Sequence, residues 1–176
     1  ESLTFGETYL LWMEYSRGKR RNRTLQEYRR VERKHLAPIR SRLLSDIEPH
    51  DLHRLHKSLG KRGQVLANRA ICQIAAVYSF AKKHLKLTIN NPCDGFEKYP
   101  ESSRERYLLP QELPLFFKGL KVLKQCHQDL FKLCLWTCQR RGNVETMKWQ
   151  DIDLASKLWT LHGDEMKNRS PLTVPL

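Results

Sequence analysis

A long apolar run over residues 65–81 constrains the fold of this chain more than any other feature. Its apolar positions are Val65, Leu66, Ala70, Ile71, Ile74, Ala75, Val77, Tyr78 and Ala81. They recur with a helical period and cover most of the helix circumference, which is typical of a helix enclosed on all sides. We therefore predict that this segment is the central helix of a helical bundle.

The sequence before this run predicts three further helices and no strands. Capping residues, prolines and glycines mark where such helices begin and end. They place the three helices between Thr4 and Gly18, between Thr24 and Pro38, and between Glu48 and Gly60.

The chain changes character after the central helix. Asn90–Gly95 is a cluster of turn residues, and residues 99–106 have the composition of an exposed linker. Helical patterns follow from Pro110, over a predicted buried helix at residues 129–137, and after Gly142. Alternating patterns typical of strands then occupy residues 149–154, 157–161 and 172–176. We predict a helical domain at 1–95, a linker at 96–106, and an α+β domain with a small antiparallel sheet at 107–176.

The charge of the chain indicates an anionic partner. The chain has 32 Lys and Arg against 19 Asp and Glu, a formal net charge of +13. Residues 1–95 hold 19 basic and 9 acidic residues, whereas residues 96–176 hold 13 and 10. Because the excess is concentrated in the first domain, we expect that domain to bind nucleic acid. No apolar run is long enough to span a membrane, so we expect no membrane partner.

The sequence predicts neither a metal nor another cofactor. His50, His53 and His56 would spread over about 120° of a helix, which is too wide for one ion. Cys134 and Cys138 lie four residues apart but lack two further ligands for zinc. There is also no glycine-rich phosphate-binding loop, so no nucleotide cofactor is expected.

The order of several short motifs resembles that of phage-type tyrosine recombinases (integrases). The motifs are Asn68-Arg69-Ala70, Phe80-Ala81, Asn91-Pro92, Thr137–Val144, Met147–Asp153, Lys157-Leu158-Trp159, Met166-Lys167-Asn168 and Val174-Pro175-Leu176. Together they extend over nearly the whole chain. The resemblance implies a mainly α fold: a four-helix, SAM-like core-binding bundle, followed by a truncated α+β catalytic domain with a small antiparallel sheet.

The same resemblance implies two catalytic positions. Arg140 aligns with the arginine that binds the phosphate under attack, a role suited to a planar, permanently charged guanidinium. Lys167 aligns with the hairpin lysine that acts as general acid toward the leaving oxygen. Two residues depart from the family pattern: Cys138 replaces a glycine, and Asn143 replaces an acidic residue.

The family's second arginine box and its nucleophilic tyrosine align beyond Leu176. We therefore expect a fragment of a longer integrase that has no strand-cleaving activity of its own. The resemblance implies double-stranded DNA as partner, self-association on DNA in the full-length protein, and a cytoplasmic, nucleoid-associated location in a bacterium or phage. The alternative is a non-enzymatic helical DNA-binding regulator or accessory factor.

Two groups of residues are candidates for DNA contact. The first is a run of cations between the first two predicted helices, suited to neutralising phosphates: Arg17, Lys19, Arg20, Arg21 and Arg23. The second lies at the start of the central helix and consists of residue types that read base edges: Gln64, Asn68 and Arg69.

Overall fold

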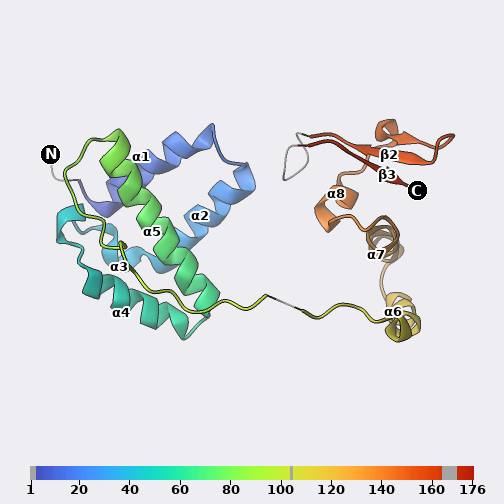
Figure 1. Ribbon diagram of the computed structural model, residues 1–176, viewed down its shortest axis with the longest axis horizontal. Helices are drawn as coiled ribbons and strands as arrows, with labels where there is room; N and C mark the ends of the chain where they lie inside the picture. Colours follow the sequence, from blue (N-terminus) through green and yellow to red (C-terminus); the bar gives the residue numbers. More distant parts are fainter. Residues whose placement is uncertain (1–2, 104, 164–169) are drawn as a thin grey trace. The chain divides into compact units, whose positions relative to one another are not determined.

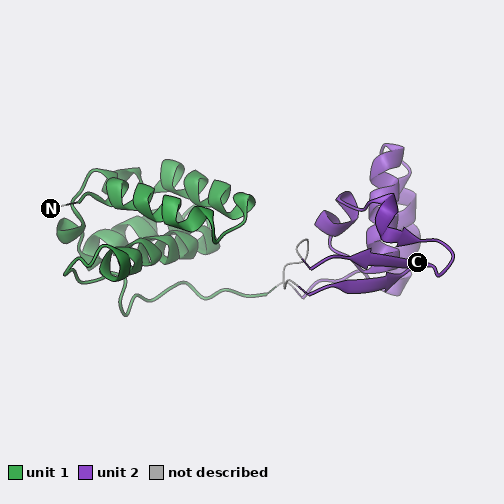
Figure 2. Ribbon diagram, turned by 90° about the horizontal axis from the view of Figure 1, so that it is seen from above, with its two compact units in different colours: residues 1–104 green, residues 105–176 purple. Residues whose placement is uncertain are grey.

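The computed structural model describes residues 3–103, 105–163 and 170–176. The chain divides into two compact units, Glu1–Arg104 and Glu105–Leu176 (Figure 2). Each unit has its own hydrophobic core. The mainly helical architecture with a small antiparallel sheet confirms the predicted fold class.

Unit 1 is a helical bundle built around one long helix (Figure 1). Its helices are α1 (Phe5–Arg17), α2 (Asn22–His35), α3 (Ala37–Arg40), α4 (Pro49–Gly60) and α5 (Gln64–His84). The predicted central helix is α5, and its apolar residues Ile71, Ile74 and Val77 are almost completely buried. Helix α5 contacts α1, α2 and α4, which explains why apolar residues cover so much of its circumference.

Local sequence signals fix some helix ends and miss others. Thr4 caps α1 as predicted, in a reciprocal capping box with Glu7. The prediction that Thr24 opens the second helix is wrong, because α2 begins at Asn22 with Arg21 in the N-cap position. Pro38 does not simply end that helix either. It lies in the first turn of α3, where its missing N–H costs no hydrogen bond.

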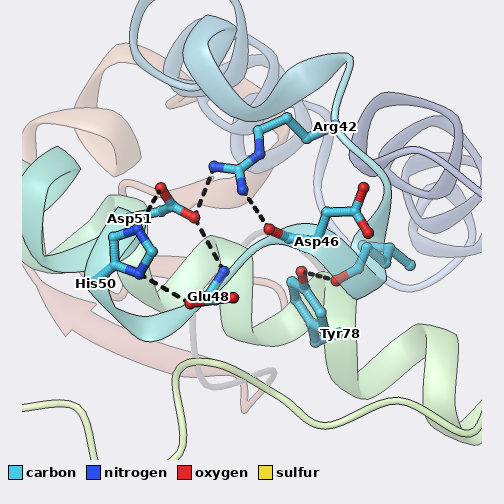
Figure 3. Close-up of polar contacts among 7 residues, drawn as sticks. Arg42, Asp46, Glu48, His50, Asp51 and Tyr78 are labelled. Carbon is cyan, nitrogen blue, oxygen red and sulfur yellow. Dashed lines mark hydrogen bonds and ion pairs between the residues drawn. The ribbon is translucent and has the colours of Figure 1, made fainter.

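A polar network holds the loop between α3 and α4 (Figure 3). The Arg42 guanidinium pairs with Asp51 at 2.7 Å and also donates to the backbone carbonyl of Asp46. Asp51 accepts the backbone N–H of Glu48 at 3.1 Å, at the first turn of α4. The Tyr78 hydroxyl donates to the carbonyl of Leu44 at 2.8 Å, which ties the same loop to α5.

The segment after α5 belongs to unit 1 rather than to a linker. Its partly buried apolar side chains pack on the core of the bundle: Leu85, Leu87, Ile89, Cys93, Phe96 and Tyr99. The first unit therefore extends beyond the predicted boundary at residue 95, because Phe96 and Tyr99, which follow the Asn90–Gly95 turn, are still partly buried on the bundle.

In its described residues, unit 2 combines three α-helices with a three-stranded sheet. The helices are α6 (Leu113–Leu120), α7 (Gln125–Thr137) and α8 (Arg141–Glu145), and the strands are β1 (Ile152–Asp153), β2 (Leu158–Leu161) and β3 (Leu172–Pro175). The sheet is antiparallel with order β1-β2-β3, and Trp159 is opposite both Ile152 and Val174. Trp159 is therefore the centre of the small core.

Helix α7 is only half buried, so the prediction of a buried helix at residues 129–137 is wrong. Leu130, Leu133 and Cys134 form an i, i+3, i+4 stripe that packs on the core. Trp136 leaves 67% of its surface exposed. The core of unit 2 covers one face of the helix only. Within the described residues, no helix has the length and apolar character needed to cross a membrane.

Candidate nucleic-acid interface

The loop between α1 and α2 exposes a dense group of cations. Its members, called here the loop cations, are Arg17, Lys19, Arg20, Arg21 and Arg23, and all are exposed. Gly18 ends α1, and Lys19 and Arg20 donate their backbone N–H groups to the carbonyl of Ser16. The turn and the helix ends on either side of it therefore present five neighbouring cations to solvent, an arrangement that suits phosphate binding.

The second predicted group lies at the N-terminal end of α5, whereas the loop cations lie near its C-terminal end. Gln64 is the first residue of α5, and Gln64 and Arg69 are both exposed. Lys19 lies near His84, the last residue of α5, since both contact the Tyr15 ring. Its charge lowers the pKa of the His84 imidazole, after the larger effects of desolvation and Lys83. A helix of 21 residues is about 30 Å long. Along the helix, the structure therefore places Gln64 about 30 Å and Arg69 about 22 Å from the end of α5 near Lys19.

Helix α2 connects these two ends. Its first turn contains Arg23, the last of the loop cations. Its Glu27 lies close enough to Arg69 for that cation to lower the carboxyl pKa, after the larger effect of the hydrogen bond from Arg30. At the C-terminal end of α2 lies His35, whose pKa is lowered by burial and, after that, by cations that include Arg62. Arg62 lies just before α5 in the chain. Cations thus extend along α2 from the loop to the start of α5.

Asn68 requires a correction. It was predicted to contact a base edge, but only 2% of its surface is exposed and its amide is fully used inside unit 1. Its Nδ2 donates to the Tyr99 carbonyl and to Glu101 Oε1, while its Oδ1 accepts the Tyr99 N–H. An asparagine amide can pair with a base edge or with a peptide group. Here the Asn68 amide binds the backbone of Tyr99 and so holds the segment after α5 on the bundle.

His56 completes this arrangement. Its Nε2 lies 3.0 Å from Asn68 Oδ1, an atom that can only accept, so Nε2 carries the proton and donates. The imidazole stacks on the Tyr99 ring at 4.3 Å between centroids. A Cβ on Gly60 would lie 2.5 Å from the Tyr99 hydroxyl, so the ring needs a glycine at that position. No local sequence pattern predicts the pairing of Asn68 with Tyr99, because the two residues are 31 positions apart.

Unit 2 presents Arg140 at a helix start. Arg140 is exposed and is the N-cap residue of α8, whose backbone N–H groups at Asn143 and Val144 bond to its carbonyl. Val144 is buried in the core and anchors the helix. In the described part of the chain, no acidic group forms an ion pair with the Arg140 guanidinium, whereas neighbouring Arg141 pairs with Glu145 at 3.4 Å. Arg140 is therefore the cation available to an external anion.

The two departures from the family pattern lie on either side of Arg140. Cys138 has φ 53° and ψ 24°, the left-handed conformation that favours glycine. This left-handed conformation explains why the family pattern has a glycine at this position. Cys138 adopts the same conformation at a cost in conformational free energy, because it has a Cβ atom. Asn143 donates to Gln139 Oε1 at 3.2 Å and so braces the turn that carries Arg140.

Lys167 and its neighbours at residues 164–169 lie outside the described residues. The strands before and after this segment, β2 and β3, are paired in register from Leu158↔Pro175 to Leu161↔Leu172. Next to it, His162 Nε2 lies 3.2 Å from Asp151 Oδ1, and the Asp151 side chain is only 5% exposed.

The histidines that were considered for a metal site have other contacts. His50 lies 3.1 Å from Glu48 and 3.4 Å from Asp51 (Figure 3). His53 stacks on Phe96 at 4.5 Å between ring centroids. His50 therefore contacts the first turn of α4, and His53 packs on the segment after α5.

The first part of the chain matches a known domain family. Residues 4–60 match the model of the family described as "Phage integrase, N-terminal SAM-like domain". No curated protein matches the sequence.

Solved structures match over both units. A lambda integrase tetramer bound to a Holliday junction has a TM-score of 0.81 and 17% identity, over 99% of this chain and 51% of that one. The Tn1549 transposon integrase in complex with a circular intermediate DNA has a TM-score of 0.79 and 17% identity, over 99% of this chain and 62% of that one. The chain thus spans about half to three fifths of the length of these two proteins, and its fold is theirs.

Proposed function

We propose that this chain is part of a phage-type tyrosine recombinase, the family that its sequence resembles and whose fold it has. The resemblance is confirmed by the match of residues 4–60 to the integrase SAM-like domain and by the fold of both units. In this proposal unit 1 binds double-stranded DNA and unit 2 carries part of the site for strand cleavage. The whole protein would cut and rejoin DNA through a phosphotyrosine intermediate.

The observation that carries the proposal is the line of exposed cations along unit 1. The loop cations lie near the C-terminal end of α5 and Arg69 lies in its second turn, about 22 Å away along the helix. One turn of B-DNA is about 34 Å long, so both groups can reach the backbone of one duplex within a single turn. Contacts of this kind give affinity without reading sequence.

Arg140 has a different role in the proposal. Its guanidinium is exposed beside a helix start and can donate two parallel hydrogen bonds to the oxygens of one phosphate. In the transition state of phosphoryl transfer, negative charge on those oxygens would be stabilised by a cation already in place. Lys167 would supply the proton for the leaving oxygen, as its alignment implies.

Partners and location follow from the same proposal. The lambda integrase structures include a dimer on a core site and a tetramer on a junction. By analogy we propose self-association on DNA for the protein to which this chain belongs. Its place of action would be the cytoplasm, at the nucleoid.

Salt-dependent binding to duplex DNA tests the proposal. If about five phosphates are neutralised, log K should fall against log salt with a slope of roughly −4 to −5, at about −0.9 per phosphate. Affinity that does not change with salt would contradict the electrostatic interface. Binding to an acidic protein or heparin with equal affinity and no preference for DNA would favour a general polyanion-binding module instead.

A further inference from the structure

A second basic cluster lies at the C-terminal end of α5, and Lys19 is its one member among the predicted DNA contacts. The last turn of α5 carries Lys82, Lys83 and His84, and Lys86 follows with a left-handed backbone conformation, φ 56°. All four side chains are exposed. Lys19, one of the loop cations, joins the cluster from the loop between α1 and α2.

Aromatic rings give this cluster a fixed geometry. The Tyr15 ring lies 4.3 Å from the His84 ring and 5.2 Å from the Phe80 ring, and Phe80 stacks on His84 at 5.4 Å. The Lys19 ammonium lies 3.5 Å above the centre of the Tyr15 ring, a cation–π contact. Two elements distant in sequence thus hold one imidazole and one ammonium group near each other, before any ligand is present.

The charges around His84 share one sign. Lys83, Lys19 and Lys86 lower the pKa of His84, after the larger effect of partial desolvation by the packed rings. Within the described residues, no carboxylate forms an ion pair with Lys19, Lys83 or Lys86. Partial desolvation and, after it, these cations therefore disfavour the imidazolium form of His84, and an external anion that neutralised the cations would oppose their effect.

We propose that His84, Lys19, Lys83 and Lys86 form a phosphate-binding site for the DNA backbone, and that His84 takes up a proton when the site is filled. This inference rests on the proposed function, since it assigns the anion to duplex DNA. A bound phosphodiester neutralises the lysines and accepts a hydrogen bond from the imidazolium, so protonation and binding favour each other. The chain then binds DNA more tightly as the pH falls.

The pH dependence of affinity tests the inference in the 176-residue chain. Between about pH 7.5 and pH 6, affinity for a duplex of arbitrary sequence should rise roughly three- to tenfold, since one pKa unit corresponds to a factor of ten. His84→Gln keeps a polar side chain that does not titrate, and should remove most of that rise. His127→Gln, an exposed histidine of unit 2, is the matched control and should leave the rise unchanged.

His35 needs its own variant, because it also lies among cations. Burial, Arg62, Lys34 and Arg30 all lower its pKa. His35→Gln should therefore remove at most a separate part of the rise, and the loss caused by His84→Gln should persist in that background. A rise carried wholly by His35 would overturn the assignment to His84.

A direct titration distinguishes the sources of the anion. The NMR pKa of His84 should increase when duplex DNA is added, and the increase should be lost in a Lys83→Gln, Lys86→Gln double variant that still binds DNA. Millimolar inorganic phosphate should give a much smaller increase if the duplex backbone is the ligand. Duplex binding without any change in the His84 pKa would overturn this inference and leave the proposed function intact. Absence of duplex binding at every pH would overturn both.

Discussion

The side-chain amide of Asn68 pairs with both backbone polar groups of Tyr99. Nδ2 donates to the Tyr99 carbonyl at 2.9 Å, and Oδ1 accepts the Tyr99 N–H at 3.0 Å. The Asn68 side chain thereby forms the pair of hydrogen bonds that a neighbouring β-strand would form with the backbone of Tyr99, in the segment after α5.

Replacing Asn68 should therefore release this segment. Asn68→Ala removes four hydrogen bonds and leaves His56 and the Tyr99 backbone without their partner, so unit 1 should lose roughly 2–3 kcal/mol of stability. Trypsin should then cut faster after Lys98 at temperatures well below unfolding. Gln64→Ala, an exposed change on the same helix, should alter stability by less than about 0.5 kcal/mol. Equal effects of the two substitutions on urea midpoints would contradict the role assigned to Asn68.

The turn before Arg140 offers a stabilising substitution. Because Cys138 has φ 53°, Cys138→Gly should relieve the cost of a left-handed conformation and raise the stability of unit 2 by about 1 kcal/mol. Cys126→Gly removes a thiol from the first turn of α7, where the backbone is helical, and should be neutral or destabilising by up to about 1 kcal/mol. Thermal unfolding of the two variants under reducing conditions compares them. A destabilised Cys138→Gly would mean that the Cys138 side chain contributes more than its backbone costs.

Acid should weaken the loop network through Asp51. The backbone N–H of Glu48, and then Arg42, hold the pKa of Asp51 below its ordinary value. A carboxyl with a lowered folded-state pKa contributes stability above its unfolded-state value, and this is lost as the pH falls through the folded-state value. The free energy of unfolding of the parent chain should thus exceed that of Asp51→Asn by a constant amount above about pH 5, and this difference should shrink below about pH 4. Urea unfolding across this range measures it, with Glu14→Gln as an exposed control. An advantage that grew on acidification would have the wrong sign for this network.

The sequence predicted those features that depend on neighbouring residues. The Thr4 cap, the glycine that ends α1 and the apolar pattern of α5 are local, and each is present in the structure. Contacts between distant residues were missed. Asn68 has the right side chain for a base edge and the right neighbours for the family motif, and only the position of Tyr99 shows where its amide is directed.

The errors in unit 2 have a related cause. An apolar composition predicted that α7 is buried, but burial depends on what covers each face, and only the stripe of Leu130, Leu133 and Cys134 is covered by the core of this unit. In contrast, the strand patterns at 157–161 and 172–176 correspond to β2 and β3, because alternation is a property of the strand itself. The predicted strand at 149–154 is wrong over Trp149–Asp151, which form a 3-10 helix, and only Ile152–Asp153 pair as β1.

The loop cations should each contribute one phosphate contact. Arg20→Ala should lower the affinity for all duplexes alike and reduce the magnitude of the salt slope by about one. Arg40→Ala removes the same charge from a side chain that already pairs with Glu32 at 3.3 Å, so its effect on the slope should be clearly smaller. Filter binding over a salt series compares the two variants. An equal change in slope would show that net charge alone, and not the position of Arg20, determines binding.

Arg140 and Arg141 provide the sharpest comparison, because they are adjacent and carry the same charge. Arg141 lies 3.4 Å from Glu145, whereas Arg140 is exposed at the N-cap of α8 without an ion pair among the described residues. If unit 2 places Arg140 on a phosphate, Arg140→Ala should reduce the magnitude of the salt slope by about one, and Arg141→Ala should change it far less. Neither substitution removes a buried contact, so both variants should unfold within about 0.5 kcal/mol of the parent chain. Arg140→Lys separates charge from geometry: it keeps the charge and the salt slope, but it cannot form two parallel hydrogen bonds, so affinity should still fall. A salt slope that depends on Arg141 and not on Arg140 would remove Arg140 from the proposed phosphate site.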